Sequence, residues 1–320
     1  MKAVRVGVIG AGIMGANHAR VLRQLPEAVL TAVVDQDLER ANLVVGPEGR
    51  GVVDLAEVID EIDAAVVAVP TKFHHDITLQ LLRAGKHVLV EKPIAATEVE
   101  AKAMVEAAEE LGLVFAVGHI ERFNPAVVEL SKWIENPVHI RIERINPYSG
   151  RILDGVVMDL MIHDLDIVLS LADGAEVVDV EGIGHHVRSD SEDLAVVTLR
   201  FANGLTASLT TSRLGQQKIR QIEVTQHESV VVADLLRQDI TINRMTRSEY
   251  LSNEGTRYRQ SSMVEIPFLE VRGEPLALEL SHFIECILTD GLPRVDGEAG
   301  LRALRLASYI SSRISRTERG

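Results

Sequence analysis

Short apolar runs alternate with amphipathic stretches through the first third of the chain. The runs have the length and β-branched content of strands that are buried on both faces, and they cover residues 4–9, 30–34, 64–69, 86–90 and 114–117. Between them, residues 13–25, 77–83 and 97–111 carry apolar side chains at helical spacing, and we expect Thr97 to cap the last of these helices and Gly112 to end it. Strands that alternate with helices predict a doubly wound parallel α/β sheet.

The pattern changes after residue 120. Residues 138–145 alternate between apolar and polar side chains, which predicts a half-exposed strand. Asn203-Gly204 predicts a hairpin turn between two of the later strands. We expect those later strands at residues 176–187, 194–201, 205–211, 221–226, 230–234 and 240–242. Residues 244–262 are predicted to form a polar, mobile loop, and helices are predicted at 275–288 and 298–313.

Length and composition support two domains and limit the partners. A chain of 320 residues is too long for one ordinary core, so we expect a domain at 1–120 and an α+β domain with a large, mostly antiparallel sheet at 121–320. The net charge of −14 argues against nucleic acid as a partner. No apolar run is long enough to span a membrane, and Cys286 is the only cysteine. We therefore expect a cytoplasmic protein with no membrane partner.

A glycine-rich turn joins the first strand to the first helix. Gly10, Gly12 and Gly15 have the spacing at which the first glycine permits a tight turn, the second admits a pyrophosphate and the third allows close packing. The N–H groups at Ile13 and Met14 open the helix toward that anion. Such a turn also occurs in unrelated α/β proteins, but here strand, helix and a distant acid are all present.

That acid is Asp35, at the end of the second strand, where a carboxylate binds the adenosine ribose. Gln36 and Asp37 follow it, and neither would bind a 2′-phosphate. The first domain is therefore predicted to be a Rossmann domain that binds NAD rather than NADP.

Two further strands end in polar residues. Val69, Pro70 and Thr71 lie at the carboxyl end of the predicted strand at 64–69, where ligands of open α/β sheets bind. We therefore expect them to contact the cofactor. His74 and the residue after it are equally consistent with exposed imidazoles at a helix start. Glu91-Lys92-Pro93 ends the next strand; the lysine either donates to a substrate hydroxyl or the nicotinamide ribose, or forms a solvated pair with Glu91.

The second half contains a candidate general base. Asp159 and His163 are four residues apart in an apolar helical stretch and share one face, which Asp166 continues. A carboxylate beside an imidazole raises its basicity, as the deprotonation of an alcohol requires. The alternative is a purely structural helix, in which the acidic side chains are solvated and His163 covers a core contact. His185 and His186 lie in a predicted strand, and we expect no metal site.

Together these motifs resemble the glucose-fructose oxidoreductase / inositol dehydrogenase / MocA family. The most specific element is Gly85-Lys86-His87-Val88 leading into Glu91-Lys92-Pro93. The resemblance implies that Lys92 hydrogen-bonds the reacting hydroxyl and that His163 is the general acid/base, with Asp159 beside it. It also implies that His74 and Glu91 lie near the nicotinamide ribose, and that the chain forms a homodimer or homotetramer through the open face of its second sheet.

The stretch 118–126 and the segment 159–166 look most like the nucleotide-sugar branch of that family, which includes UDP-N-acetylglucosamine 3-dehydrogenases. Arg122 sits at the junction of the two halves, where it either orients substrate or bridges the domains. A diphosphate group needs cations, and the candidates to bind it are Arg122, Arg144 and Arg151. The expected substrate-binding residues are Lys92, His119, Arg122, Arg151, Asp159 and His163. The alternatives are an inositol or simple-sugar dehydrogenase, and a non-catalytic sensor.

Overall fold

The computed structural model describes residues 3–149, 154–252 and 255–317. The chain forms two compact units: unit 1 comprises Met1–Phe123 and Gly273–Arg305, and unit 2 comprises Asn124–Arg272 and Leu306–Gly320. The first boundary lies three residues beyond the expected one. Residues 273–305, which we expected in the second domain, pack with the first. No helix in the described ranges has the length and apolar character needed to cross a membrane.

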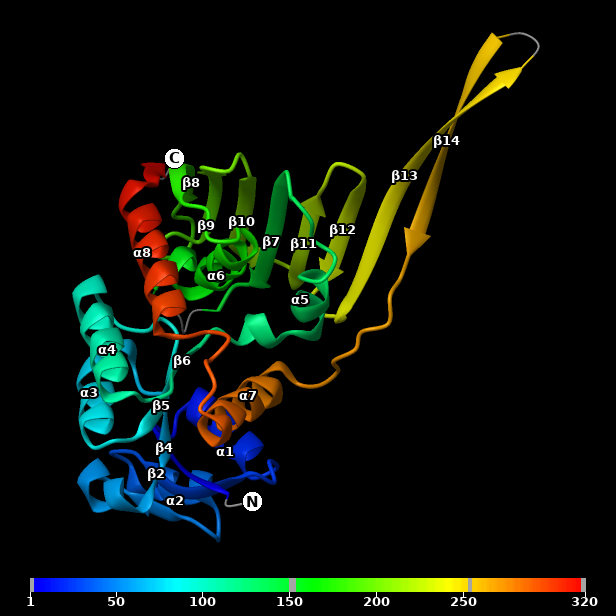
Figure 1. The fold of residues 1–320 in the computed structure, drawn as a ribbon. Helices are drawn as coiled ribbons and strands as arrows, with labels where there is room; N and C mark the ends of the chain where they lie inside the picture. The colour runs from blue at the N-terminus through cyan, green and yellow to red at the C-terminus, as the bar shows by residue number, and fades with distance from the viewer. Residues whose placement is uncertain (1–2, 150–153, 253–254, 318–320) are drawn as a thin grey trace. The chain divides into compact units, whose positions relative to one another are not determined.

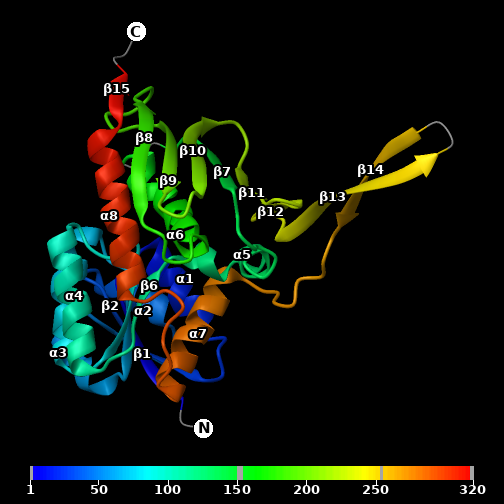
Figure 2. The ribbon, with the colours of Figure 1, turned by 45° about the horizontal axis from the view of Figure 1, so that its top comes forward.

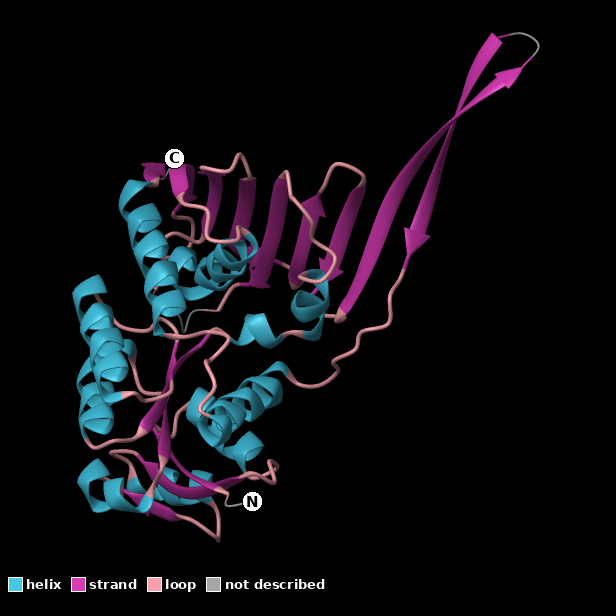
Figure 3. Cartoon of the chain, viewed as in Figure 1, coloured by secondary structure: helices cyan, strands magenta, loops and turns pink. Residues whose placement is uncertain are grey.

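Unit 1 is built on a six-stranded sheet in the order β3-β2-β1-β4-β5-β6, in which every pair is parallel. The strands, coloured magenta in Figure 3, are β1 Val4–Ile9, β2 Ala28–Val34, β3 Arg50–Val52, β4 Ala64–Val67, β5 His87–Glu91 and β6 Phe115–Gly118. β2 and β3 lie on one side of β1, and the chain then crosses over so that β4, β5 and β6 lie on the other side, which confirms the doubly wound arrangement. β4 is buried at all four residues, as expected of a central parallel strand.

Within the described residues, five helices of eight or more residues lie wholly in unit 1: α1 Ile13–Leu22, α2 Leu38–Val45, α3 His74–Arg83, α4 Glu98–Leu111 and α7 Pro275–Thr289. The capping predictions for α4 are confirmed, because Thr97 and Glu100 form a capping box and Gly112 ends the helix at φ 63°. α7 packs on α1 and shares one apolar core with it. This burial explains why a C-terminal segment belongs to the first unit.

Unit 2 is built on a nine-stranded sheet in the order β14-β13-β12-β11-β7-β10-β9-β8-β15. Its strands are β7 His139–Pro147, β8 Val177–His185, β9 Leu194–Phe201, β10 Thr206–Gly215, β11 Ile219–Thr225, β12 Ser229–Asp234, β13 Asp239–Ser252, β14 Gly255–Glu265 and β15 Ser315–Thr317. Within the described ranges only β7–β10 and β8–β15 pair in parallel, so the mostly antiparallel prediction is confirmed.

One face of this sheet is covered by helices (Figure 1). Along β9, Ala195, Val197 and Leu199 are buried, and the residues between them are open or half-open. α5 Pro125–Leu130 packs on β12 and β13, and the helical segment that leads into α6 Ile162–Leu171 packs on β10. The last helix, α8 Gly297–Arg313, contains the point at which the two units divide.

The prediction of a mobile loop at 244–262 is wrong. β13 and β14 form one long antiparallel hairpin that extends past the rest of the sheet (Figure 2). β12 pairs with β13 only as far as Arg244, and beyond it the two strands pair with each other alone. Hydrophobic alternation reveals a strand only where one face is buried, and this polar ribbon lacks that signal.

Candidate active site

The glycine turn of unit 1 has the geometry that its spacing predicts. Gly10 has φ 101°, and a Cβ there would lie 2.6 Å from the carbonyl oxygen of Ala68. A Cβ at Gly15 would lie 1.8 Å from the carbonyl oxygen of Gly10, so α1 packs directly on the turn. A Cβ at Gly12 meets nothing within 4 Å, and the neighbouring Ile13 is 77% exposed. The open space therefore lies beside Gly12, where a pyrophosphate would approach.

Asp35 lies at the same edge of the sheet and is tied to the turn. Its Oδ2 accepts from the backbone N–H of Ala11 at 2.7 Å, and its Oδ1 accepts from that of Asp37 at 2.9 Å. Nη2 of Arg40, five residues after Asp35 and so not indicated by the residues next to it, lies 3.4 Å from Asp35 Oδ1. The fixed carboxylate and the open glycine turn fit the ribose and pyrophosphate of NAD.

His74 connects the ends of two strands. It is 1% exposed, so the alternative of an exposed imidazole is wrong for this residue. Its Nε2 lies 2.9 Å from the carbonyl oxygen of Val69, and its Nδ1 lies 2.9 Å from that of Pro93. Burial lowers the pKa of His74, although both carbonyls favour the charged ring. The imidazole thus joins the loop after β4 to the loop that contains Lys92.

Glu91 is held in a buried hydrogen bond rather than in a solvated pair. Its Oε1 lies 2.7 Å from Nε2 of His18, which is fully buried on α1. Its Oε2 accepts from the backbone N–H of Lys92 at 3.2 Å. Burial raises the pKa of Glu91, but the bond with His18 and the charges of His18 and Lys92 outweigh it, so the net pKa is lowered.

Lys92 is therefore held on both sides. Glu91 binds its backbone N–H, and His74 binds the carbonyl of the next residue, Pro93. The Lys92–Pro93 peptide bond is cis, an isomer that the sequence alone left open. The lysine side chain is half-buried at the carboxyl end of β5, which is the edge where ligands of such sheets bind.

Unit 2 carries Asp159 and His163 on a helix that starts irregularly. Residues Val157–Met161 form a π-helical turn, and α6 follows at Ile162. Such turns are frequent at functional sites. Asp159 and His163 are both partly exposed. Asp166, by contrast, is buried, so it does not continue an exposed stripe.

Arg144 is not available to a substrate, contrary to our expectation. Both Arg144 and Asp164 are buried, and they form an ion pair with N–O distances of 2.7 to 3.0 Å. Breaking one side of such a pair is costly, since an uncompensated buried charge remains. The pair fixes α6 to β7.

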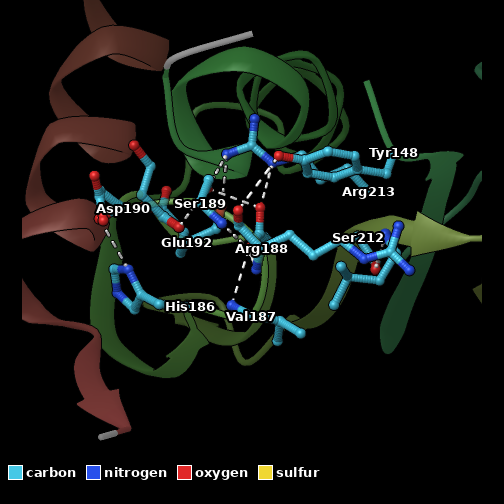
Figure 4. Close-up of polar contacts among 12 residues, drawn as sticks. Tyr148, His186, Val187, Arg188, Ser189, Asp190, Glu192, Ser212 and Arg213 are labelled. Atoms are coloured by element: carbon cyan, nitrogen blue, oxygen red, sulfur yellow. Dashed lines mark hydrogen bonds and ion pairs between the residues drawn. The ribbon is translucent and has the colours of Figure 1, made fainter. Parts of the chain in front are cut away.

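Asp193 holds together the tight turn at Val187, Arg188 and Ser189, three residues that Figure 4 labels. Its Oδ2 accepts from the backbone N–H groups of Val187, Arg188 and Ser189 at 2.9, 2.6 and 3.0 Å. Its Oδ1 lies 2.9 Å from Nε of Arg213. Burial raises the pKa of Asp193, but these hydrogen bonds outweigh it and place the pKa well below the usual range.

The turn brings Glu192 to the start of the helix that carries Asp159 and His163. The Oε1 of Glu192 accepts from the backbone N–H of Val157 at 3.1 Å, and its carbonyl accepts from that of Val156 at 3.0 Å. A Cβ at Gly155 would lie 2.0 Å from Oε1 of Glu192. Glu192 therefore caps this helix, a role that its sequence position did not indicate.

The remaining predicted residues have varied environments. In unit 1, His119 is fully buried and Arg122 is half-buried. Thr71 begins a short helical turn, Thr71–Phe73, after Pro70. Arg151 lies outside the described residues. Within the described residues, no three His, Cys, Asp or Glu side chains gather as metal ligands would.

Comparison with known proteins identifies the family. The model of the oxidoreductase family with an NAD-binding Rossmann fold matches residues 4–119, and that of the GFO/IDH/MocA C-terminal domain matches residues 132–230. A UDP-N-acetylglucosamine 3-dehydrogenase of Acidithiobacillus ferrooxidans is 32% identical over 96% of both chains. The chain belongs to the GFO/IDH/MocA oxidoreductase family.

Relatives in this family agree with the fold and with the class of activity. A solved structure of the A. ferrooxidans enzyme covers 98% of both chains with a TM-score of 0.87. A scyllo-inositol 2-dehydrogenase (NAD(+)) of Bacillus subtilis is 30% identical over 91% of this chain and 88% of its own. The family member described here is accordingly an NAD-dependent oxidoreductase and not a non-catalytic sensor.

We expect the substitution Gly12→Ala to separate cofactor binding from folding. Its Cβ meets no protein atom within 4 Å, so the melting temperature without NAD should change by about 1 °C or less. The same methyl group occupies the space beside the turn, so the Kd for NADH, measured by fluorescence, should rise about tenfold or more. Unchanged NADH affinity would place the pyrophosphate elsewhere.

Proposed function

We propose that this family member oxidises a secondary hydroxyl, at C3, of a nucleotide sugar such as UDP-N-acetylglucosamine. The observation that carries this proposal is the similarity to the A. ferrooxidans UDP-N-acetylglucosamine 3-dehydrogenase, which extends over nearly the whole of both chains. The motifs on which the reaction depends, Glu91-Lys92-Pro93 and Asp159 with His163, are present in this sequence.

The roles proposed for these residues are those that the resemblance to the family implies, and their charges suit them. His163 takes the proton from the substrate hydroxyl, and Asp159 orients its ring and raises its basicity. The Lys92 ammonium donates to the same oxygen and stabilises the developing alkoxide. NAD, when bound, supplies the acceptor for the hydride. The side chains of Glu91 and His74 contact the backbone of Lys92 and Pro93. These contacts support the proposal because they restrict where Lys92 can lie.

A diphosphate needs cations, and with Arg144 paired internally the candidates are Arg122, Arg151 and a residue not anticipated, Arg294. Nη1 of Arg294 lies 3.4 Å from the carbonyl oxygen of Arg122, and its guanidinium lies 5.2 Å from the ring centre of Phe123. Burial lowers the pKa of Arg294, and the charge of Arg122 lowers it further. Two neighbouring guanidinium groups favour an anionic ligand.

Arg294 also lies at the appropriate edge of the sheet. Asp296 bridges to Ala116 in antiparallel fashion, so the chain before Asp296 runs toward the carboxyl end of β6. Ligands of open α/β sheets bind at that edge. His119 and Arg122 follow β6 and complete the proposed substrate contacts in unit 1.

A second candidate is an inositol or simple-sugar dehydrogenase, because the B. subtilis relative that is 30% identical acts on scyllo-inositol by its name. A melting-temperature panel separates the two. Ligands that bind only the folded state stabilise it by mass action. We expect UDP-N-acetylglucosamine or UMP to add to the stabilisation by NAD, and myo-inositol to add nothing. Stabilisation by NAD with inositol alone would favour the second candidate.

Substitution of Lys92 or His163 tests the assigned roles. Lys92→Ala and His163→Ala should each lower kcat by about 10²- to 10⁴-fold, because each removes a group that acts on the reacting oxygen. The Kd for NADH should change by less than about threefold in His163→Ala. Lys86→Ala, directly before β5, serves as the control and should leave turnover unchanged. Near-normal kcat in either variant would contradict the assignment.

Self-association is proposed for the open face of the unit 2 sheet. Ile183, Val196 and Ile219, on strands β8, β9 and β11, expose 38 to 41% of their surface. Exposed apolar groups on a broad sheet favour burial against a second copy of the chain.

Light scattering should therefore give two or four times the mass of one chain. Ile183→Lys should shift the protein toward smaller species, because it places a charge in the contact. Leu43→Lys, at an exposed position of α2, should leave the mass unchanged. A monomeric natural chain at micromolar concentration would refute this proposal.

A further inference from the structure

Unit 1 contains a buried carboxyl group that the proposed chemistry does not use. Glu279, on α7, is 2% exposed, and neither of its oxygens has a hydrogen-bond partner within the described residues. A polar group without partners in a protein interior is rare, and an ionised one is costly. The Glu279 carboxyl is therefore either neutral, or retained at this position for a functional reason.

The neighbour whose charge acts on Glu279 is Glu91. Glu91 is hydrogen-bonded to Nε2 of His18, while Nδ1 of the same imidazole is buried and has no partner within the described residues. Three polar atoms thus lack partners in one buried group of two carboxyls and an imidazole: both oxygens of Glu279 and Nδ1 of His18. The group adjoins Lys92 through the bond from its backbone N–H to Glu91.

Other charged residues near α7 have separate roles. α7 packs on α1 and on the short helical turn Ile120–Phe123. The titratable and charged residues on these elements are His18, Arg20, Glu121 and Arg122, and α7 itself also carries His282, Glu285 and Cys286. Arg20 forms an exposed ion pair with Glu274. Burial and the charge of Glu91 are what act on Glu279, and both raise its pKa well above the usual value.

The two carboxyls differ in the partners that stabilise an ionised form. Burial opposes ionisation of both, but Glu91 has His18 and Lys92 to stabilise its charge, and its pKa is lowered. Glu279 has no such partner, so the charge resides on Glu91. Close carboxyls in a dry interior do not both ionise without repulsion.

We propose that Glu279 is a positioning residue for the hydride-transfer site: it retains its proton so that Glu91 stays between His18 and the backbone of Lys92. The neutral carboxyl can donate a hydrogen bond, and Nδ1 of His18 accepts one when Nε2 carries the ring proton. In this proposal the donor serves Nδ1 of His18, directly or through one buried water. Ionisation of Glu279 would repel Glu91 and loosen the segment that holds Lys92. The proposal rests on the proposed function only in placing Lys92 beside the nicotinamide.

The variant Glu279→Gln tests this directly, because an amide is a permanently neutral replacement that keeps a donor. In the natural chain the Kd for NADH, measured by fluorescence without substrate, should rise by up to about tenfold per pH unit once Glu279 ionises. In Glu279→Gln it should stay flat over the same range. Glu285→Gln, at an exposed position of the same helix, is the matched control and should behave as the natural chain does.

Stability gives a second readout. A carboxyl whose pKa is raised by folding contributes its full stability below its unfolded pKa, and that stability is lost as the pH rises through the folded pKa. Relative to Glu279→Gln, the melting temperature of the natural chain should therefore fall by about 2 °C per pH unit above about pH 5, until Glu279 ionises in the folded protein. The infrared band of a protonated carboxyl should be present near neutral pH and absent in Glu279→Gln.

Glu279→Leu distinguishes positioning from simple removal of charge. It also removes the pH dependence, but it takes the donor away from His18, so NADH should bind more weakly at every pH. The same pH dependence of NADH affinity in the natural chain and in Glu279→Gln would overturn the proposal, as would an unchanged infrared band. Because no substrate is used, these outcomes do not depend on which sugar is oxidised.

Discussion

The buried hydrogen bond between Glu91 and His18 is the contact on which the cofactor site depends. It joins β5, which leads directly into Lys92, to α1, which begins at the glycine turn. The helix that would hold the pyrophosphate and the strand that carries the lysine are thereby fixed to each other through one carboxylate. α7, from near the C-terminus, packs on α1 and keeps the pair dry. This explains why two distant segments of the chain form one unit.

Unit 2 also contains buried charged side chains whose hydrogen bonds and ion pairs hold more exposed residues in place. Asp193 accepts three backbone N–H groups and so shapes the turn that presents Glu192 to the helix start. The Arg144–Asp164 pair holds the following helix to the sheet. Asp159 and His163 are partly exposed on this fixed helix. In both units the residues proposed to react are positioned by polar contacts that are themselves withdrawn from solvent.

Local rules predicted the parallel sheet, the glycine turn, the capped helix at Thr97 and the antiparallel second sheet, because each has a period or a cap that short stretches of sequence reveal. They failed where the decisive partner is remote. The ion pair of Arg144 with Asp164, the contact of His74 with the carbonyl of Pro93 and the cap by Glu192 join residues that are 19 to 35 positions apart. The long hairpin was missed because neither of its faces gives an apolar signal.

The most direct measurement follows the hydrogen that is transferred. UDP-N-acetylglucosamine carrying deuterium at C3 should yield deuterated NADH, detected by mass spectrometry, and the same sugar carrying deuterium at C4 should yield unlabelled NADH. This result would establish C3 oxidation of a nucleotide sugar by hydride transfer to NAD. Unlabelled NADH from the C3-deuterated sugar, or no turnover of this sugar while an inositol is oxidised, would contradict the account.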